Sequence, residues 1–328
     1  MENESASRPN SLKIAVIGDI MLDVYIDGTV ERLNPEAPNC LVLDEVKRSY
    51  SLGGSGHVAH NLIRFGVNAN LCGTIGIRDH IDSMRLSSII HTISSGPRPG
   101  RLNMFEIPAL GRKPTVKTRC RSLGQQLLRV DNEDSSPVPC DIDATTAIDA
   151  AIKDVNAVIL SDYAKGVLSD DILTYLFCQL AQKKIPYLVD PKRLTLNDYS
   201  TAAVCPLVIS PNNKEFKQST EYRDKRPINA HNVVVTDGRN GCHIVRGSVA
   251  THWNFQTIPS KHEVAVADPS GAGDTFLAAL ATAMLSGASL ERACQVANYA
   301  AACAVKERGV VTLNDDELQE FARQLEQK

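Results

Sequence analysis

Short runs of apolar, mostly β-branched residues recur along the chain and alternate with longer stretches of helical character. The runs cover Lys13–Gly18, Ala157–Leu160, Tyr187–Val189, Leu207–Ile209 and Val233–Thr236. Helices are expected between and after them, over His57–Phe65, Asp170–Lys183 and Thr275–Ser286. Strands that are short and apolar throughout are typical of parallel sheets covered on both faces. The pattern therefore predicts a three-layer α/β/α fold with a mostly parallel sheet.

Two segments interrupt this alternation. Val24–Leu52 holds two β-rich runs, and Val116–Val130 alternates polar with apolar residues around a turn expected at Leu123-Gly124. We expect these lid segments, about 24–52 and 116–130, to form a small β sheet over a cleft. Ser94–Gly100 reads as an exposed insertion. No linker divides the rest, so residues 12–325 are expected to form a single domain after a polar, disordered leader, residues 1–11.

Composition narrows the class of protein. The 328 residues carry 35 basic and 38 acidic side chains, a formal net charge of −3, and 43% of them are hydrophobic. A chain of this kind folds, and its charge gives no reason to expect a nucleic-acid partner. The uncharged stretch Thr275–Leu290 is too short for a membrane span. Nine scattered cysteines without a CxxC pair indicate reduced thiols and a cytoplasmic location, and argue against a structural zinc site.

The strongest chemical signal is the sequence ADPSGAGDTF, Ala267–Phe276. Gly271, Ala272 and Gly273 can turn consecutive backbone N–H groups toward one point, and a helix beginning near Asp274 adds its positive dipole end there. This arrangement predicts an anion-binding site with a carboxylate able to take a proton from a neighbouring hydroxyl group. An ordinary glycine turn followed by an acidic helix terminus fits the four letters GAGD equally well.

A second glycine-rich turn, GGSGHVAHNLIRFG, covers Gly53–Gly66. Gly53 and Gly54 would let a ligand approach the backbone closely at a helix start. The spacing does not fit G-x-G-x-x-G, and the strand Lys13–Gly18 ends in Gly18-Asp19 rather than in a glycine cluster. These features count against a dinucleotide-binding fold.

Together the two glycine motifs make the chain resemble the ribokinase-like (PfkB) sugar kinase family along nearly its whole length. The resemblance implies an ATP-dependent kinase that uses Mg²⁺, with Asp274 as catalytic base and Gly271–Gly273 as anion hole. It further implies a nucleotide site in which Asn212 and Glu215 lie near phosphate and magnesium and reach the metal ion through water. The strand and turn at Thr236, Gly238 and Gly241 would belong to the same site, with Asn298 on the helix beside the adenine. In this family lid sheets often pair, so a homodimer through the lid is expected.

Within the family, the chain is most similar to the D-glycero-β-D-manno-heptose 7-phosphate kinases, which form the 1,7-bisphosphate for ADP-heptose synthesis. The motifs are GDIMLDVY (Gly18–Tyr25), RLNPEAP (Arg32–Pro38), QQLLRVD (Gln125–Asp131), LSDYAKGVL (Leu160–Leu168) and VDPK (Val189–Lys192). The chain ends soon after its last expected helix, so a stand-alone kinase without a nucleotidylyltransferase domain is expected. Kinases of another sugar, of a nucleoside or of a ketose phosphate remain alternatives, as does a non-catalytic sugar or nucleotide sensor with the same fold.

The acceptor side carries its own predictions. The resemblance implies sugar contacts from Asp23, Gly53, Gly54, His57 and Asn61, with His57 replacing the usual Asn; the stretch Gly76–Arg112 also departs from the family pattern. Asp19 is expected to hold sugar or to brace its loop. A row of cations, Lys117, Arg119 and Arg121, together with Lys165 and Lys192 after strand ends, predicts binding of a remote phosphate, although solvated strand edges carry such charges too. With an ordinary pKa near ~4, Asp274 would take the proton late in the reaction.

Overall fold

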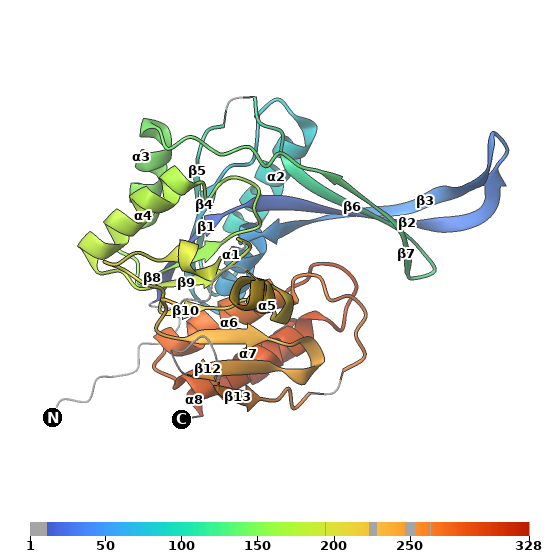
Figure 1. Ribbon diagram of the computed structural model, residues 1–328. Helices are drawn as coiled ribbons and strands as arrows, with labels where there is room; N and C mark the ends of the chain where they lie inside the picture. Colours follow the sequence, from blue (N-terminus) through green and yellow to red (C-terminus); the bar gives the residue numbers. More distant parts are fainter. Residues whose placement is uncertain are drawn as a thin grey trace.

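The computed structural model describes residues 12–109, 111–193, 195–222, 228–246, 254–262 and 264–327. The predicted leader, residues 1–11, lies outside these described residues. The chain folds into three layers, with helices on both faces of a large sheet, and a second sheet projects from this body (Figure 1). The predicted α/β architecture with a β lid is thus confirmed.

The large sheet contains nine strands in the described part of the chain. They are β1 (Lys13–Gly18), β4 (Asn68–Gly73), β5 (Leu102–Glu106), β8 (Ala157–Ser161), β9 (Tyr187–Asp190), β10 (Val208–Ile209), β11 (Val233–Thr236), β12 (Cys242–Arg246) and β13 (Asn254–Ile258). Their order is β13-β12-β11-β10-β9-β8-β1-β4-β5. All neighbours are parallel except at one edge, where β12 pairs antiparallel with β11 and β13. Sites in such sheets lie beyond the carboxyl ends of the parallel strands.

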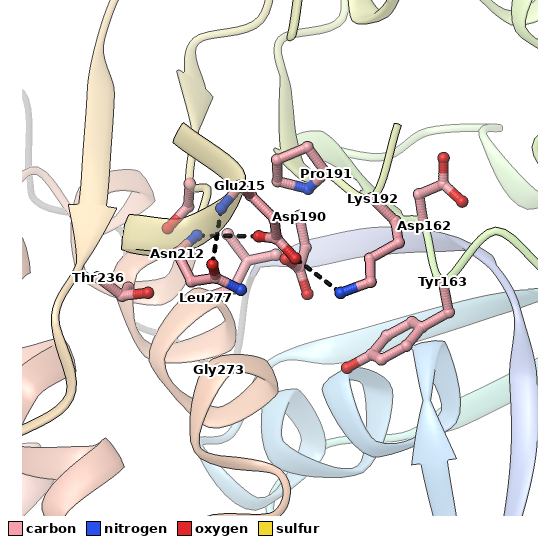
Figure 2. A pocket seen from close by; sticks show the side chains of 11 residues that line it. Asp162, Tyr163, Asp190, Pro191, Lys192, Asn212, Glu215, Thr236, Gly273 and Leu277 are labelled. Atoms are coloured by element: carbon pink, nitrogen blue, oxygen red, sulfur yellow. Dashed lines mark hydrogen bonds and ion pairs between the residues drawn. The ribbon is translucent and has the colours of Figure 1, made fainter. Parts of the chain in front are cut away.

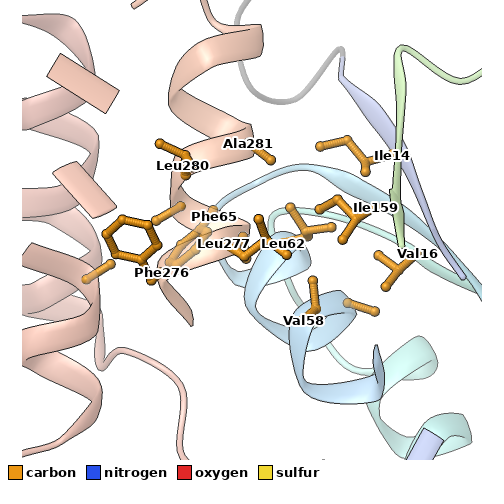
Figure 3. Packing of buried hydrophobic residues seen from close by; sticks show 14 of the residues in the cluster. Ile14, Val16, Val58, Leu62, Phe65, Ile159, Phe276, Leu277, Leu280 and Ala281 are labelled. Carbon is orange, nitrogen blue, oxygen red and sulfur yellow. The ribbon is translucent and has the colours of Figure 1, made fainter. Parts of the chain in front are cut away.

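Alternating residues of the strands bury opposite faces of the sheet. On β1, Ile14 and Val16 belong to one core and Ala15 and Ile17 to the other. The first core is covered by α1 (Ser55–Arg64), α2 (Ile81–Ser95), α6 (Ala272–Leu285), α7 (Leu290–Ala304) and α8 (Asp315–Glu326). The second is covered by α3 (Ile142–Ala151), α4 (Asp170–Lys183) and α5 (Asn213–Tyr222). Figure 3 shows α1 and α6 packed together over β1 through Val58, Leu62 and Leu277.

The lid is a four-stranded sheet in the order β3-β2-β6-β7. Its strands are β2 (Ile20–Asn34), β3 (Ala37–Gly54), β6 (Thr115–Ser122) and β7 (Gln125–Asn132). The β6–β7 turn lies at the predicted Leu123 and Gly124, both with positive φ, which suits a two-residue hairpin. β2 and β3 extend far from the body as one long hairpin (Figure 1). These strands run further into the body than the sequence pattern indicates, because β2 begins directly after β1.

The structure differs from the sequence-based prediction at several elements. Helix α6 begins at Ala272, two residues before Asp274 and three before the expected Thr275, because the glycine-rich turn is followed at once by helical backbone. Ser94–Gly100 is not an insertion but the end of α2 and the connection to β5, and the divergent stretch Gly76–Arg112 contains both of these elements. None of the helices in the described residues is long and apolar enough to cross a membrane.

Candidate active site

The glycine turn before α6 forms the floor of the site. Gly271 adopts a left-handed conformation with φ of 81°, and a methyl group added there would lie 2.8 Å from His57 Nε2, so glycine is required at this position. A methyl group added to Gly273 would meet nothing within 4 Å, because Gly273 faces a cavity of about 170 Å³. The first N–H groups of a helix lack acceptors within the helix, so this turn can bind an anion.

Asp274 lies in the first turn of α6 and is only 4% exposed. Its Oδ1 accepts a hydrogen bond of 2.7 Å from the Tyr163 hydroxyl group. Burial raises the pKa of Asp274 to about 7, with the nearby Asp23 carboxylate adding to the increase, while Tyr163 and Lys117 oppose it. The expected pKa near 4 is therefore wrong, and Asp274 is a much better matched base at neutral pH.

Tyr163 was not among the predicted site residues, although it stands in the motif LSDYAKGVL. Its backbone N–H donates to Asp19 Oδ2 at 2.8 Å, and the Lys165 and Val167 N–H groups donate to the same carboxyl group. Asp19 is buried and braces this loop, which was one of its two predicted roles. Only the fold brings the loop after β8 to the start of α6, so no local signal in the sequence indicates the contact between Tyr163 and Asp274.

His57 and Asn61 lie beneath the anion-binding turn, and both are buried in α1, at 1% and 0% exposure. Asn61 Nδ2 donates to Thr275 Oγ1 at 3.1 Å and lies 3.1 Å from His57 Nε2. Thr275 Oγ1 in turn donates to the Gly271 carbonyl group at 2.9 Å. Burial lowers the pKa of His57 to about 3, so its ring stays neutral. Both side chains therefore support the turn, and their predicted contacts with sugar stay a prediction.

Asp23 lies on β2 where the lid joins the body, and it forms an ion pair with Arg119 on β6. A methyl group added at Gly53 would lie 2.0 Å from Asp23 Oδ2, which explains the first glycine of the early motif as room for this carboxylate. Gly54 has φ of 58° and a methyl group there would lie 2.3 Å from the Asp19 carbonyl oxygen. Both glycines therefore let the end of β3 pass close to acidic residues of the site.

The predicted row of cations lies on one face of β6, but its charges are largely engaged. Arg121 forms an ion pair with Asp27 at 2.8 Å, and Arg119 forms one with Asp23. Lys165, after β8, pairs with Glu133 at 2.6 Å. The exception is Lys117, whose ammonium group lies over the Tyr163 ring, 5.0 Å from its centroid. Protein carboxylates therefore already engage four of the five predicted cations, Lys192 included, and a bound phosphate would have to share or replace these partners.

The cavity beside Gly273 joins several predicted nucleotide-side residues (Figure 2). It is lined by Asp162, Tyr163, Asp190, Pro191, Lys192, Ser210, Asn212, Glu215, Thr236, Gly273 and Leu277. Lys192, predicted to bind the acceptor, pairs here with Glu215 at 2.8 Å. We therefore correct its grouping to the nucleotide side. Burial, together with nearby Asp274 and Glu215, raises the pKa of Asp190.

Asn212 and Glu215 have a structural role that the sequence analysis overlooked. The Glu215 N–H donates to Asn212 Oδ1, and the Asn212 N–H donates to Glu215 Oε2, each at 2.9 Å. This reciprocal pair is a capping box at the start of α5. The spacing Asn-x-x-Glu could have indicated this capping role, since it matches a capping box as well as a phosphate motif.

The remaining nucleotide-side residues lie around the ends of β11 and β13. Thr236 lines the cavity, while Gly238 and Gly241 bound the turn after β11 with φ of 53° and 93°. Asn298 on α7 is buried, and its Nδ2 donates to the Ile258 carbonyl group at 3.0 Å. Asn298 thus holds the end of β13 in place, and its predicted position beside the adenine stays a prediction.

Comparison with known sequences gives a consistent family. Residues 130–317 match the pfkB family carbohydrate kinases. The chain is 35% identical to the "Bifunctional protein HldE" of Granulibacter bethesdensis, over 94% of this chain and 64% of that protein. It is 31% identical to the protein of the same name from Campylobacter curvus, over 95% of this chain and 65% of the relative. The chain therefore spans slightly less than two thirds of the length of these relatives.

Solved structures show the same fold at low identity. Phosphofructokinase-2 from Escherichia coli, in complex with substrates and products, superimposes with a TM-score of 0.72 at 17% identity, covering 96% of this chain and 99% of that one. Ribokinase from Arabidopsis thaliana, complexed with ribose and ATP, gives a TM-score of 0.63 at 18% identity, covering 95% and 98%.

Proposed function

Because this chain belongs to the pfkB family of carbohydrate kinases, we propose that it transfers the γ-phosphoryl group of ATP to a phosphorylated sugar. The acceptor we propose is D-glycero-β-D-manno-heptose 7-phosphate, phosphorylated on its anomeric hydroxyl group to the 1,7-bisphosphate. One observation carries the proposed chemistry: a buried carboxyl group, Asp274, stands beside the N–H groups that open α6. The heptose itself rests on the sequence motifs and not on the geometry.

In the proposed reaction, Asp274 Oδ2 accepts the proton of the acceptor hydroxyl group, since Oδ1 already accepts from Tyr163. The acceptor oxygen forms a bond to the γ-phosphorus as the bond to the bridging oxygen breaks, and ADP leaves with the electron pair. The N–H groups of Gly271–Gly273 stabilise the negative charge on the transferred group. A pKa of about 7 leaves about half of the Asp274 groups ionised at neutral pH, so a base is available without a large energetic cost.

The cavity beside Gly273 has the donor set that Mg²⁺ prefers. Its lining offers carboxylate, amide and hydroxyl oxygens, and Asp190 has no side-chain hydrogen bond among the described residues. Asn212 and Glu215 would hold the metal ion through water, because both oxygens of Glu215 already accept from protein groups. When bound, Mg²⁺ neutralises charge on the nucleotide phosphates. Lys192, paired with Glu215, adds positive charge to the same side.

A second hollow, of only about 10 Å³, would have to widen to receive the phosphate of the acceptor. It is lined by Asp19, Ile20, Thr74, Gly76, Arg112, Lys113, Pro114, Thr115, Lys165 and Val167. Lys113 is exposed there and makes no ion pair among the described residues. With two threonine hydroxyl groups it would provide donors for a phosphate at the end of the sugar remote from Asp274, and Lys165 would join them on exchanging Glu133 for the phosphate.

We also propose that two copies associate through their lids. The lid strands expose large apolar side chains, among them Leu128 and Val130 at 56% and 51% exposure. A contiguous apolar surface on a projecting sheet is typical of an association site.

The test of the proposed function compares wild type with Asp274→Asn in steady-state assays of ADP formation. We expect Asp274→Asn to lose ~10²–10⁴ in kcat, the usual cost of removing a general base, while ATP affinity stays within a few-fold. The wild type should use heptose 7-phosphate at least ~10² better in kcat/KM than unphosphorylated heptose, because two charge-assisted hydrogen bonds are lost. ATP binding without turnover on any phosphorylated sugar would instead support the sensor alternative. Near-normal turnover by Asp274→Asn would contradict the proposed mechanism.

A further inference from the structure

The Tyr163 hydroxyl group makes the one side-chain hydrogen bond to Asp274 that the described part of the chain provides. We propose that Tyr163 is a positioning residue for phosphoryl transfer, which holds Oδ1 of Asp274 so that Oδ2 faces the acceptor hydroxyl group. This inference rests on the proposed role of Asp274 as base. It assigns a task to a residue that neither the glycine motifs nor the cation row indicate.

The protein holds Tyr163 in place before any ligand binds. The three N–H groups of Tyr163, Lys165 and Val167 all donate to Asp19, a buried carboxylate at the end of β1. Ala164 within this loop has φ of 54°, so the chain turns sharply just after the tyrosine. On the other side, the ring lies 3.5 Å from where a methyl group on Gly54 would be. A side chain that is already held in place can orient its partner during the reaction with little further loss of conformational entropy.

The hydrogen bond also acts on the charge of Asp274. Titratable groups reach its surroundings from several elements, namely Asp23 on β2, His57 on α1, Lys117 on β6 and Asp190 on β9. Asp23 disfavours the ionised form, and His57 is neutral. Donation by the Tyr163 hydroxyl group stabilises the ionised form and lowers the pKa of Asp274 against the stronger effect of burial. Without that hydroxyl group, Asp274 would hold its proton to a higher pH.

Lys117 connects this pair to the lid. Its ammonium group lies 5.0 Å from the centre of the Tyr163 ring, a cation–π contact made from strand β6. Burial lowers the pKa of Lys117, while Asp23 raises it. The lid therefore touches the catalytic carboxyl group indirectly, through the face of the tyrosine ring.

The experiment measures kcat/KM between pH 5.5 and 9.5, roughly two units either side of the Asp274 pKa, for wild type and Tyr163→Phe. In the profile of kcat/KM against pH, we expect the midpoint of the acidic limb near pH 7 for wild type. The midpoint for Tyr163→Phe should lie about one pH unit higher, because a hydrogen bond to a charged group shifts a pKa by roughly this amount. The variant should then lose roughly fivefold at pH 7 and recover most of that loss above pH 9. Tyr175→Phe is the matched control: it removes a tyrosine–carboxylate hydrogen bond to Asp149, on helices α4 and α3, and should leave the profile unchanged.

The outcomes separate this inference from the proposed function. An unshifted limb with the same loss at every pH would overturn the role of Tyr163 while leaving that of Asp274 intact. An active Asp274→Asn enzyme would overturn the proposed function itself. Should Tyr163→Phe fail to fold, a fluorotyrosine placed at position 163 keeps the ring and the hydroxyl group but makes that group a stronger donor to Asp274. We expect the limb then to move to lower pH, and an unmoved limb there would count against the inference.

Discussion

Burial of Asp274 serves proton transfer and weakens the fold at the same time. A carboxyl group in water titrates near 4, whereas burial holds the pKa of Asp274 at about 7. The folded protein therefore binds this proton more tightly than the unfolded chain does. Binding of this proton stabilises the folded protein fully below pH 4, and this stabilisation is lost as the pH rises through 7. Asp274 must be ionised to act as a base, and its ionisation lowers the free energy of unfolding.

A stability measurement tests this directly. We expect Asp274→Asn, which cannot ionise, to gain about 2.5 kcal/mol of stability relative to wild type between pH 5 and pH 8, since a folded pKa of about 7 lies two units above the lower pH. The readout is the free energy of unfolding in urea at both pH values. Asp27→Asn is the control: Arg121 lowers the pKa of Asp27, so this carboxyl group is ionised in both the folded and the unfolded protein from pH 5 to pH 8, and the difference in stability between Asp27→Asn and wild type should stay constant over that range. A constant difference between Asp274→Asn and wild type would contradict the raised pKa.

At the scale of the element, one sequence pattern occurs twice with the same local structure. Asn212-x-x-Glu215 caps α5 beside the cavity, and Asn314-x-x-Glu317 caps α8 at the far end of the chain. Each box satisfies two N–H groups that the helix start would otherwise leave unpaired. Only the motif at Asn212 lies at the site. A comparison of the two motifs can therefore distinguish the contribution of helix capping from that of nucleotide binding.

We therefore predict different consequences for two equivalent substitutions. Asn212→Ala and Asn314→Ala should each cost about 1 kcal/mol of stability, the usual value of an N-cap. Asn212→Ala alone should also raise the KM for ATP in the presence of Mg²⁺. Unfolding curves and ATP titrations of both variants provide the measurement. An unchanged KM for Asn212→Ala would reduce the motif to its capping role.

How far the sequence predicts each element depends on the range of the interactions that form it. Buried strands such as β1 and β8 can be predicted, because both of their faces lie in the core and nearly all of their residues are therefore apolar. β13 was not predicted: it is an edge strand, and most of its residues are exposed. In the site, Asp274 and its glycines carry a local motif, whereas the contacts of Tyr163 and of His57 depend on elements more than 100 residues away. Such partners become visible only once the fold is known.

The whole molecule divides into a compact body and a lid with little core of its own. Leu33, Leu41 and Val46 on the β2–β3 hairpin are 55%, 50% and 74% exposed, and every residue of β7 is exposed. Long hairpins are marginally stable in water without a surface to pack against. A second copy of the lid would supply that surface.

We predict that the protein sediments as a dimer in analytical ultracentrifugation. Replacing Leu128 and Val130 together by Lys should shift it to monomer, since two charges would have to be buried at the interface. Ile142→Lys, at a 78% exposed position on α3, is the control and should leave the sedimentation coefficient unchanged. A monomeric wild type, or a double variant that remains dimeric, would contradict association through this face.

The pairing of β2 with β3 is regular from Ile20 to Asp27, and its irregularities lie beyond, at Asp27/Gly28, Thr29/Arg32 and Leu33/Asn34. Side chains alternate along a strand, so the loss or gain of one residue between Ile20 and Asp27 would turn Asp23 and Tyr25 to the opposite face. The distal part of the hairpin already absorbs extra residues as bulges. The hairpin can therefore change its length at the tip without disturbing the site, whereas a single inserted or deleted residue next to the body would reorient its acidic and aromatic side chains.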